Sequence, residues 1–180
     1  MRRIAVTGGI AEGKSTVLGY LSEMGYSIES ADRVARAVFS SEHVQRRIAE
    51  LLCIEPPVPP EIVRSKLHEP SVRRAVNAIT HPRILEGLRS SGAHFFEIPL
   101  LIETCLQGTF DRVWVVTCGM EEQRQRLMTR LGSDASVESI IGTQLTSRTK
   151  IPFGDRVIRT NQAESSVKRF VTLAAQQDLR

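Results

Sequence analysis

Several features are missing from the sequence, and each absence limits what the chain can be. No apolar run is long enough to cross a membrane, and no signal-peptide core follows the N-terminus. Cysteine is scarce: Cys53, Cys105 and Cys118 are odd in number and widely separated, and none belongs to a Cys-x-x-Cys pair. This spacing argues against a disulfide framework or a zinc site and favours reduced, buried thiols. Together these absences predict a cytoplasmic protein with no membrane partner.

The sequence also has no block of basic residues. Its net charge of +4 comes from lysines and arginines spread along the chain. A polyanionic small molecule explains that charge as well as a nucleic acid does, so we expect small-molecule substrates and no nucleic-acid partner. The chain has 180 residues, which suits one well-buried core and is too short for two ordinary domains. We expect a single domain over residues 1–180, as a monomer or a weak homo-oligomer.

Strand patterns alternate with helix patterns along the chain. Short apolar or alternating segments predict five strands, at residues 4–6, 26–30, 95–98, 112–118 and 155–161. Helical spacing predicts helices that follow the first loop to about residue 25 and then cover residues 31–53, 62–67, 72–79, 121–130, 136–147 and 165–179. This alternation predicts an α/β fold: a mainly parallel five-stranded sheet with helices on both faces, and ligands at the carboxyl ends of the strands.

Two regions interrupt this alternation. The proline cluster "EPPVPPE" cannot continue a helix. We interpret residues 54–92 as an inserted helical subregion that binds the acceptor, the second substrate to which a group is transferred. Residues 130–150 follow a helix that carries Arg126 and Arg130 on one face, and we interpret this stretch as a lid.

The stretch "TGGIAEGKST" is typical of a loop that holds the phosphates of a nucleotide. Gly8, four residues, Gly13, Lys14 and Ser15 match the P-loop pattern between a strand and a helix, which predicts P-loop NTPase architecture. In that pattern the lysine ammonium neutralises the transferring phosphate, and the serine hydroxyl ligates Mg²⁺. The nucleotide contacts are expected at Gly8, Gly9, Ala11, Glu12, Gly13, Lys14, Ser15 and Thr16. The alternative is a glycine-rich turn that binds nothing.

Other segments narrow the class of nucleotide-binding protein. A guanine-nucleotide switch would carry Asp-x-x-Gly and Asn-Lys-x-Asp motifs, and neither is present. A motor ATPase would have an apolar strand that ends in Asp-Glu, whereas the candidate strand here ends "EIP". A kinase for small molecules needs a carboxylate for the acceptor hydroxyl, arginines around the phosphates and a lid, and each has a candidate.

Several ordered segments resemble the dephospho-coenzyme A kinase family. Beside the phosphate loop, "SADRVAR", "HPRI", "IPLLIE" and "DRVIRTN" are similar to the family's motifs, and Gln144 and Lys150 match its lid-region glutamine and lysine. The order and spacing hold from residue 4 to residue 161. The resemblance implies ATP- and Mg²⁺-dependent phosphorylation of the ribose 3′-hydroxyl of dephospho-CoA, which gives coenzyme A and ADP in the last step of coenzyme A synthesis.

The resemblance also implies roles for individual residues. Asp32 becomes the base or hydroxyl-orienting group, and Lys14 and Arg130 stabilise the transferring phosphoryl group. The implied substrate-binding residues are Asp32, Arg36, His81, Pro99, Leu100, Leu101 and Glu103, and Asn161 is implied on the adenine side.

Six of these residues also have a structural alternative. Asp32 suits a helix N-cap, and His81 and Asn161 suit caps or turns. Arg36 and Arg130 suit a solvated helix face or surface ion pairs, and Glu103 is either a polar anchor or a surface residue.

The sequence departs from the family at four positions and one segment. Ala11 replaces a glycine and Glu12 a small residue, and we expect Glu12 to point to solvent because a carboxylate beside a triphosphate repels it. Ser30 replaces an acidic residue and Leu131 an aspartate, while the segment 53–76 is shorter than in the family. These departures keep two alternatives open: another nucleoside or nucleotide kinase, and a nucleotide-binding protein without turnover.

Overall fold

The first strand begins the sheet and leads directly into the glycine-rich loop. In the computed structural model, which describes residues 2–180, the strands are β1 (Ile4–Thr7), β2 (Ile28–Ser30), β3 (Phe95–Glu97), β4 (Arg112–Thr117) and β5 (Arg156–Arg159). They form one sheet in the order β2-β3-β1-β4-β5. The pairs β1 with β3, β1 with β4 and β4 with β5 are parallel, with Ile4 opposite Phe95 and Arg112. The predicted α/β fold with a mainly parallel five-stranded sheet is confirmed.

Nine α-helices and two short 3₁₀ helices lie within the described residues. The α-helices are α1 (Lys14–Glu23), α2 (Ala31–Ser40), α3 (Glu42–Leu52), α4 (Pro60–Lys66), α5 (Pro70–Ser90), α6 (Met120–Leu131), α7 (Asp134–Ile141), α8 (Ser147–Lys150) and α9 (Glu164–Asp178). The 3₁₀ helices cover Gln107–Thr109 and Ile151–Phe153. No helix within residues 2–180 has the length and the apolar character that a membrane span requires.

The chain divides into two compact units, and each has its own core. One unit comprises Met1–Glu29 and Ala93–Arg180, and the other comprises Ser30–Gly92. We call them the sheet unit and the helical unit. The helical unit therefore starts before the subregion that we expected at residues 54–92, because α2 and α3 pack with α5 in the same unit.

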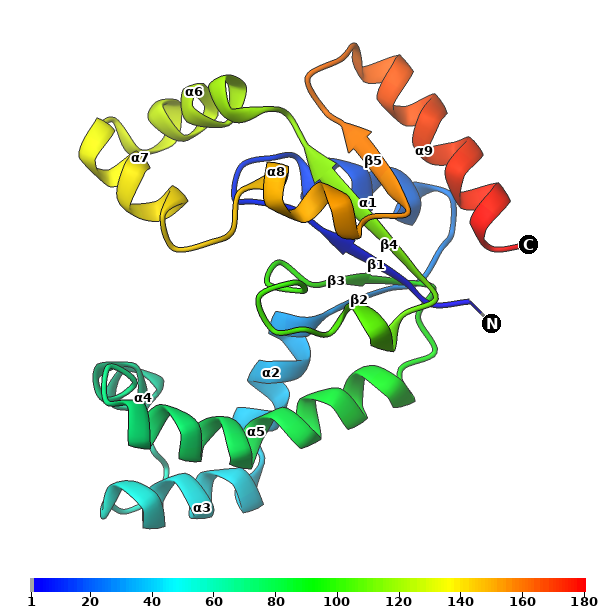
Figure 1. Cartoon of the computed structure of the whole chain (residues 1–180). Coiled ribbons are helices and arrows are strands. Elements are labelled where there is room, and N and C mark those ends of the chain that lie inside the picture. Colours follow the sequence, from blue (N-terminus) through cyan, green and yellow to red (C-terminus); the bar gives the residue numbers. More distant parts are fainter. Residues whose placement is uncertain (1) are drawn as a thin grey trace. The chain divides into compact units, whose positions relative to one another are not determined.

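In the sheet unit, alternate strand residues face α1 and α9, which pack against each other (Figure 1). Ile4, Phe95 and Trp114 are fully buried there. The Trp114 indole also donates to Asp178 at the end of α9, at 2.8 Å. On the other side of β4 lies α8, which carries the last residues of the expected lid (Figure 1).

The helical unit packs α3, α4 and α5 around aliphatic side chains, including Ile48, Val63 and Ile79. The helix expected over residues 31–53 is two helices, because Ser41 is extended (φ −69°, ψ 138°) and both ends α2 and begins α3. A serine followed by Glu42 is a helix-start signal that the apolar spacing concealed.

The helix expected to end at "THPR" instead continues to Ser90, with Pro82 in its interior. The proline removes one backbone hydrogen bond, yet α5 continues because it packs along α2 and α3. The helix expected over residues 136–147 is also wrong in its end: α7 stops at Ile141, and α8 begins only after Thr146, whose side chain accepts from the Thr149 amide.

The cysteines were predicted to be buried thiols, and this holds only for Cys118. Burial raises the pKa of the Cys118 thiol above its ordinary value. Cys53 and Cys105 are exposed, and both adopt a left-handed backbone at the ends of helical turns. Backbone turns rather than core packing place these two residues.

Candidate active site

Two glycines determine the path of the loop between β1 and α1. A Cβ on Gly8 would lie 2.3 Å from the carbonyl oxygen of Val116, so only glycine lets the loop pass so close to β4. Gly13 has φ +90°, and a Cβ there would lie 2.8 Å from Thr160 Oγ1. The loop is therefore packed tightly against the carboxyl ends of β4 and β5.

Ala11 takes a left-handed backbone conformation, with φ 59°. This is the position where the family has glycine, and alanine there costs about 1 kcal/mol. The carbonyl oxygen of Ala11 accepts a hydrogen bond from Arg126 at 3.4 Å. The conformation of the loop is thus kept despite the strained residue.

Lys14 begins α1 and folds its side chain back over the loop. Its Nζ donates to the carbonyl oxygens of Gly8 (3.0 Å) and Gly9 (2.8 Å). Ser15 and Thr16 follow in the first turn of α1 and are exposed, and that turn contains no acidic side chain. A positive charge and the amino end of a helix therefore meet at this loop, which suits an anionic ligand.

Glu12 does not point to solvent, so that expectation was wrong. The side chain is 1% exposed and lies beneath the loop. Its carboxylate accepts hydrogen bonds from the Gly9 amide, from Thr117 Oγ1 (3.0 Å) and from Ser147 Oγ. The expectation rested on the repulsion between a carboxylate and a phosphate. Three hydrogen-bond donors inside the protein instead compensate the charge of the buried carboxylate.

Arg126 of α6 joins the loop to the residue after β5. It forms an ion pair with Glu122 at 2.8 Å and donates to Thr160 O (2.9 Å) and Thr160 Oγ1 (3.3 Å). Arg130 lies one turn further and is exposed. Among the side chains that the structure describes, none forms a hydrogen bond or an ion pair with Arg130.

A cavity of about 420 Å³ opens beside the loop. Its lining comes from the loop, α1, α6, the segment after β5 and the start of α9, and comprises Ala11, Thr16, Tyr20, Arg126, Arg130, Thr160, Gln162, Glu164 and Val167. Burial, together with the nearby Glu164, raises the pKa of Tyr20 above its ordinary value. Asn161 lies in this segment but is exposed and does not line the cavity.

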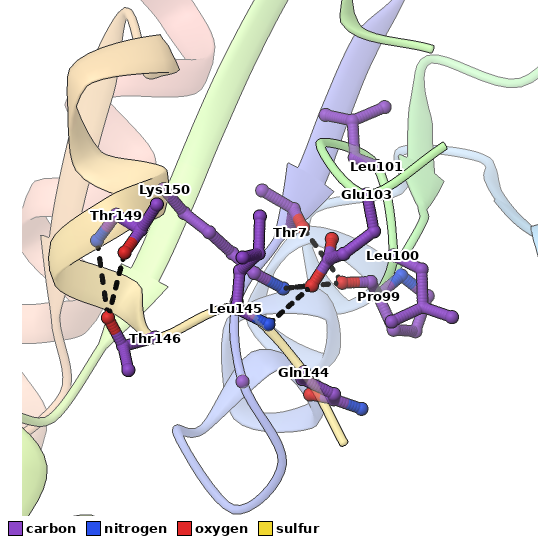
Figure 2. Close-up of polar contacts among 12 residues, drawn as sticks. Thr7, Pro99, Leu100, Leu101, Glu103, Gln144, Leu145, Thr146, Thr149 and Lys150 are labelled. Carbon is purple, nitrogen blue, oxygen red and sulfur yellow. Dashed lines mark hydrogen bonds and ion pairs between the residues drawn. The ribbon is translucent and has the colours of Figure 1, made fainter. Parts of the chain in front are cut away.

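Glu103 and Lys150 form an ion pair, with 2.9 Å between Oε1 and Nζ (Figure 2). The Lys150 side chain is fully buried, and the Glu103 side chain is 19% exposed. Lys150 also donates to the Pro99 carbonyl oxygen at 2.9 Å, and Thr7 Oγ1 donates to the same oxygen at 3.2 Å. The Leu145 amide donates to Glu103 Oε1 at 2.9 Å. Glu103 is therefore a polar anchor rather than a surface residue.

Burial alone would raise the pKa of Glu103. The hydrogen bonds from Lys150, from its own backbone and from the Leu145 amide outweigh this effect and hold the pKa below its ordinary value. The second carboxylate oxygen, Oε2, is buried and has no hydrogen-bond partner among residues 2–180.

The residues just before Glu103, in the segment 99–101, lie in different surroundings (Figure 2). Leu101 is fully buried, whereas Leu100 is 42% exposed. Pro99 contributes its carbonyl oxygen to Lys150 and Thr7. Leu100 thus has an accessible side chain, and Leu101 supports it from the core.

Asp32 and Arg36 lie one turn apart on α2, in the helical unit. Ser30, not Asp32, is the N-cap of α2, and the exposed Asp32 carboxylate lies in the first turn. The Arg36 Nε donates to the Asp32 carbonyl oxygen at 3.3 Å. Both residues line a cavity of about 720 Å³ that also contains Arg64 and apolar side chains, among them Phe39 and Leu67.

His81 is exposed within α5, so it is neither a cap nor a turn residue. Thr80, the residue before it, lines the cavity that contains Asp32, whereas His81 does not.

Several residues of the sheet unit contact the phosphate loop although no role was expected for them. Gln144 Oε1 accepts from the Ile10 amide at 3.2 Å, and Gln123 Nε2 donates to the Ile10 carbonyl oxygen at 2.9 Å. For Gln144 and Lys150 the only signal in the sequence was their match to the family's lid. For Thr117 and Ser147 there was none, because their role depends on the buried Glu12.

Comparison with known proteins gives consistent matches. A family model described as dephospho-CoA kinase matches residues 2–166. A dephospho-CoA kinase of Moorella thermoacetica is 35% identical over 98% of this chain and 92% of its own, and that of Dehalococcoides mccartyi is 31% identical over 99% and 98%. The solved structure of a dephospho-CoA kinase from Campylobacter jejuni superposes with a TM-score of 0.70 at 19% identity, over 97% of this chain and 96% of that one.

Proposed function

We propose that Asp32, Lys14 and Arg130 carry out the phosphoryl transfer of this chain, which belongs to the dephospho-CoA kinase family. The family resemblance of the sequence is confirmed. The activity is that of a dephospho-CoA kinase, with ATP as the phosphoryl donor, and it forms coenzyme A in the last step of its synthesis. The acceptor is the ribose 3′-hydroxyl of dephospho-CoA, and the second product is ADP.

For the nucleotide side, we assign the triphosphate to the loop from Gly8 to Thr16, in which the Gly9 and Ile10 amides already donate to Glu12 and Gln144. The support is a tightly packed loop, the Lys14 ammonium above it and the amino end of α1 without an acidic side chain. When ATP binds, its oxygens replace the carbonyl oxygens of Gly8 and Gly9 as acceptors for Lys14. The ammonium then neutralises charge on the transferring phosphoryl group.

Mg²⁺ is the expected metal, and we assign it to the Ser15 hydroxyl. Ser15 is exposed in the first turn of α1, and no described side chain forms a hydrogen bond with its hydroxyl. No cluster of three acidic, histidine or cysteine side chains within the described residues forms a separate metal cage. One protein hydroxyl together with phosphate oxygens and waters suits Mg²⁺, which supplies charge neutralisation on the phosphates.

For the adenine side, we assign the cavity of about 420 Å³ that Arg126, Arg130 and Gln162 line. No described side chain forms a hydrogen bond or an ion pair with the Arg130 guanidinium. We assign Arg130 to stabilise the charge of the transferring phosphoryl group. We assign Asn161 to this side as well, since it lies between the two lining residues Thr160 and Gln162.

For the acceptor, we assign the cavity of about 720 Å³ in the helical unit. Its two arginines suit the phosphates of dephospho-CoA, and its apolar side chains suit the uncharged arm. Asp32 lies on the lining of this cavity. Its carboxylate accepts the proton of the attacking hydroxyl as the oxygen bonds to the γ-phosphorus and the bond from that phosphorus to the ADP oxygen breaks. We also assign His81, Pro99, Leu100, Leu101 and Glu103 to the acceptor, with Leu101 and Glu103 acting from beneath the surface.

We propose that residues 1–180 form a single kinase domain, in which residues 130–150 act as a lid and residues 54–92 belong to the acceptor-binding region. We further propose a cytoplasmic monomer or weak homo-oligomer that binds small molecules and no nucleic acid. Three free cysteines support a reducing compartment.

The position of Asp32 carries the catalytic assignment: an exposed carboxylate that is not the N-cap of its helix and that lines a cavity with two arginines. Asp32→Asn keeps the shape and removes the base. We expect ATP affinity to stay nearly unchanged and kcat to fall by roughly 10²-fold or more. A coupled assay of ADP release measures this, with Glu42→Gln on α3 as the matched acidic control that keeps wild-type turnover.

The same assay tests the acceptor. Dephospho-CoA is expected to support ADP release, and AMP and pantetheine are not. Faster turnover with AMP would instead point to another nucleotide kinase. ATP binding without ADP release from any acceptor would point to a protein without turnover, and full activity of Asp32→Asn would remove Asp32 from the mechanism.

A further inference from the structure

Glu12 is unusual among the loop residues because it is an acidic side chain buried beneath the phosphate loop. It is 1% exposed, and no described cationic side chain forms an ion pair with it. Burying a carboxylate without a counter-ion costs free energy unless hydrogen-bond donors compensate the charge. The hydrogen-bond donors around Glu12 therefore make its burial possible, and they come from separate segments of the sheet unit.

Glu12 Oε2 accepts from the Gly9 amide within the loop and from the Ser147 hydroxyl at the start of α8. Glu12 Oε1 accepts from Thr117 Oγ1 at the end of β4. Thr117 Oγ1 in turn accepts from the Gly119 amide at 3.1 Å, where α6 begins. One carboxylate thus connects the loop to the starts of both α6 and α8.

Gly9 makes room for this arrangement. A Cβ on Gly9 would lie 2.8 Å from Glu12 Oε2 and 2.8 Å from Gln123 Nε2, which is too close for both. Since the Gly9 amide donates to Glu12, it is directed beneath the loop. The Gly9 amide is thus bonded within the protein.

The segment before α8 is held to the loop at a second point, because the Ile10 amide donates to Gln144 Oε1 at 3.2 Å. At the other end of α8, Lys150 reaches the Pro99 carbonyl oxygen and Glu103. The segment 142–150 is part of the expected lid. It is therefore anchored to the phosphate loop at Ser147 and, at Lys150, to the segment 99–103 that follows β3.

We propose that Glu12 is a positioning residue for ATP: its carboxylate fastens the phosphate loop to Ser147, so that the segment 142–150 keeps the loop in the shape that receives the triphosphate. The proposal rests on the proposed role of this loop in holding ATP. Breaking the link weakens binding of the ground state and the transition state alike, which raises KM for ATP more than it lowers kcat.

The test uses hydrogen exchange of the full chain together with steady-state kinetics, for Ser147→Ala, Glu12→Ser, Glu12→Gln and the double variant Glu12→Ser/Ser147→Ala. We expect Ser147→Ala to speed amide exchange in residues 142–150 at least threefold, and to raise KM for ATP about threefold to tenfold. We expect kcat to change less than twofold. The double variant is expected to match Glu12→Ser, since both changes break one link.

Thr117→Val is the matched control, because it also removes one hydroxyl donor from Glu12 but leaves Ser147 in place. We expect normal exchange in residues 142–150 for this variant. Glu12→Gln keeps an acceptor oxygen for Gly9 and Ser147, and its KM is expected between those of the wild type and Glu12→Ser.

Wild-type exchange and KM in Ser147→Ala, or additive effects in the double variant, would overturn the proposal. If Glu12→Ser does not fold, Ser147→Ala decides alone, since it removes one half-buried hydroxyl. A wild-type protein that fails to bind ATP would instead contradict the role of the loop. The two failures are thus distinguishable.

Discussion

Lys150 and Glu103 approach to 2.9 Å where the segment after β3 meets α8, and the lysine side chain is entirely shielded from water. Replacing Lys150 with Met leaves the half-buried Glu103 carboxylate without its cation. We expect a loss of about 3–5 kcal/mol in the free energy of unfolding, measured by urea denaturation. The double variant Lys150→Met/Glu103→Leu is expected to recover much of that loss. A double variant as unstable as Lys150→Met would show that the ion pair is not the cause.

Acid is expected to destabilise the protein through Glu103 and Asp178. The pKa of Asp178 lies below its ordinary value because Arg156 pairs with it, an effect that outweighs burial, and the Trp114 indole adds to it. The pKa of Glu103 is lowered as well. A carboxyl whose folded pKa is depressed stabilises the fold above its unfolded pKa, and this contribution is lost as pH falls through the folded pKa.

The stabilisation from these two groups should therefore be complete above about pH 5 and decline below about pH 4. Thermal unfolding followed by circular dichroism between pH 3 and pH 7 checks this. Asp178→Asn and Glu103→Gln are each expected to unfold at a lower temperature at pH 7, and to lose less on acidification than the wild type. Variants that follow the wild-type curve in parallel would disprove the assignment.

Arg126 and Arg130 are one turn apart on α6 but are expected to behave differently. Arg126 holds the loop and the residue after β5 through its bonds to Ala11 and Thr160, so Arg126→Ala should lower the melting temperature as well as the affinity for ATP. Arg130 has no such bond to a described side chain, so Arg130→Ala should lower kcat at least tenfold and keep the melting temperature. Similar melting temperatures and rates for both variants would contradict this division.

Lys14→Ala is expected to weaken both ATP affinity and turnover, because the ammonium serves the ground state and the transition state. Titration with a fluorescent ATP analogue measures the first effect, and ADP release measures the second. The loss of the bonds to Gly8 and Gly9 is a separate effect of this change, so melting temperature is recorded alongside. Retained affinity in a folded variant would exclude Lys14 from nucleotide binding.

The sheet and the loop could be predicted because their signals are local. The buried run "RVWVVTC" and the glycine spacing before Lys14 specify a strand and a turn without help from the rest of the chain. The helix boundaries at Ser41 and Pro82 could not be predicted from apolar spacing. The extended backbone at Ser41, whose hydroxyl donates to the Val38 carbonyl oxygen, decides the first boundary. Packing along α5, a tertiary effect, decides the second.

In the site, the sequence predicted the residues of the loop but not the fate of Glu12. The solvent-facing expectation considered only the repulsion from a phosphate. The burial depends on Thr117 and Ser147, which are 105 and 135 residues away along the chain. Such donors are brought together only by the fold, so no short motif reveals them.

Trp114 is the single tryptophan of the chain, and it belongs to the core of the sheet unit. Intrinsic tryptophan emission therefore reports on this unit, and the melting of α2 to α5 has no indole of its own to signal it. A tryptophan introduced at Phe39, which lines the cavity of about 720 Å³, would give the helical unit a probe for chemical denaturation and for acceptor titration.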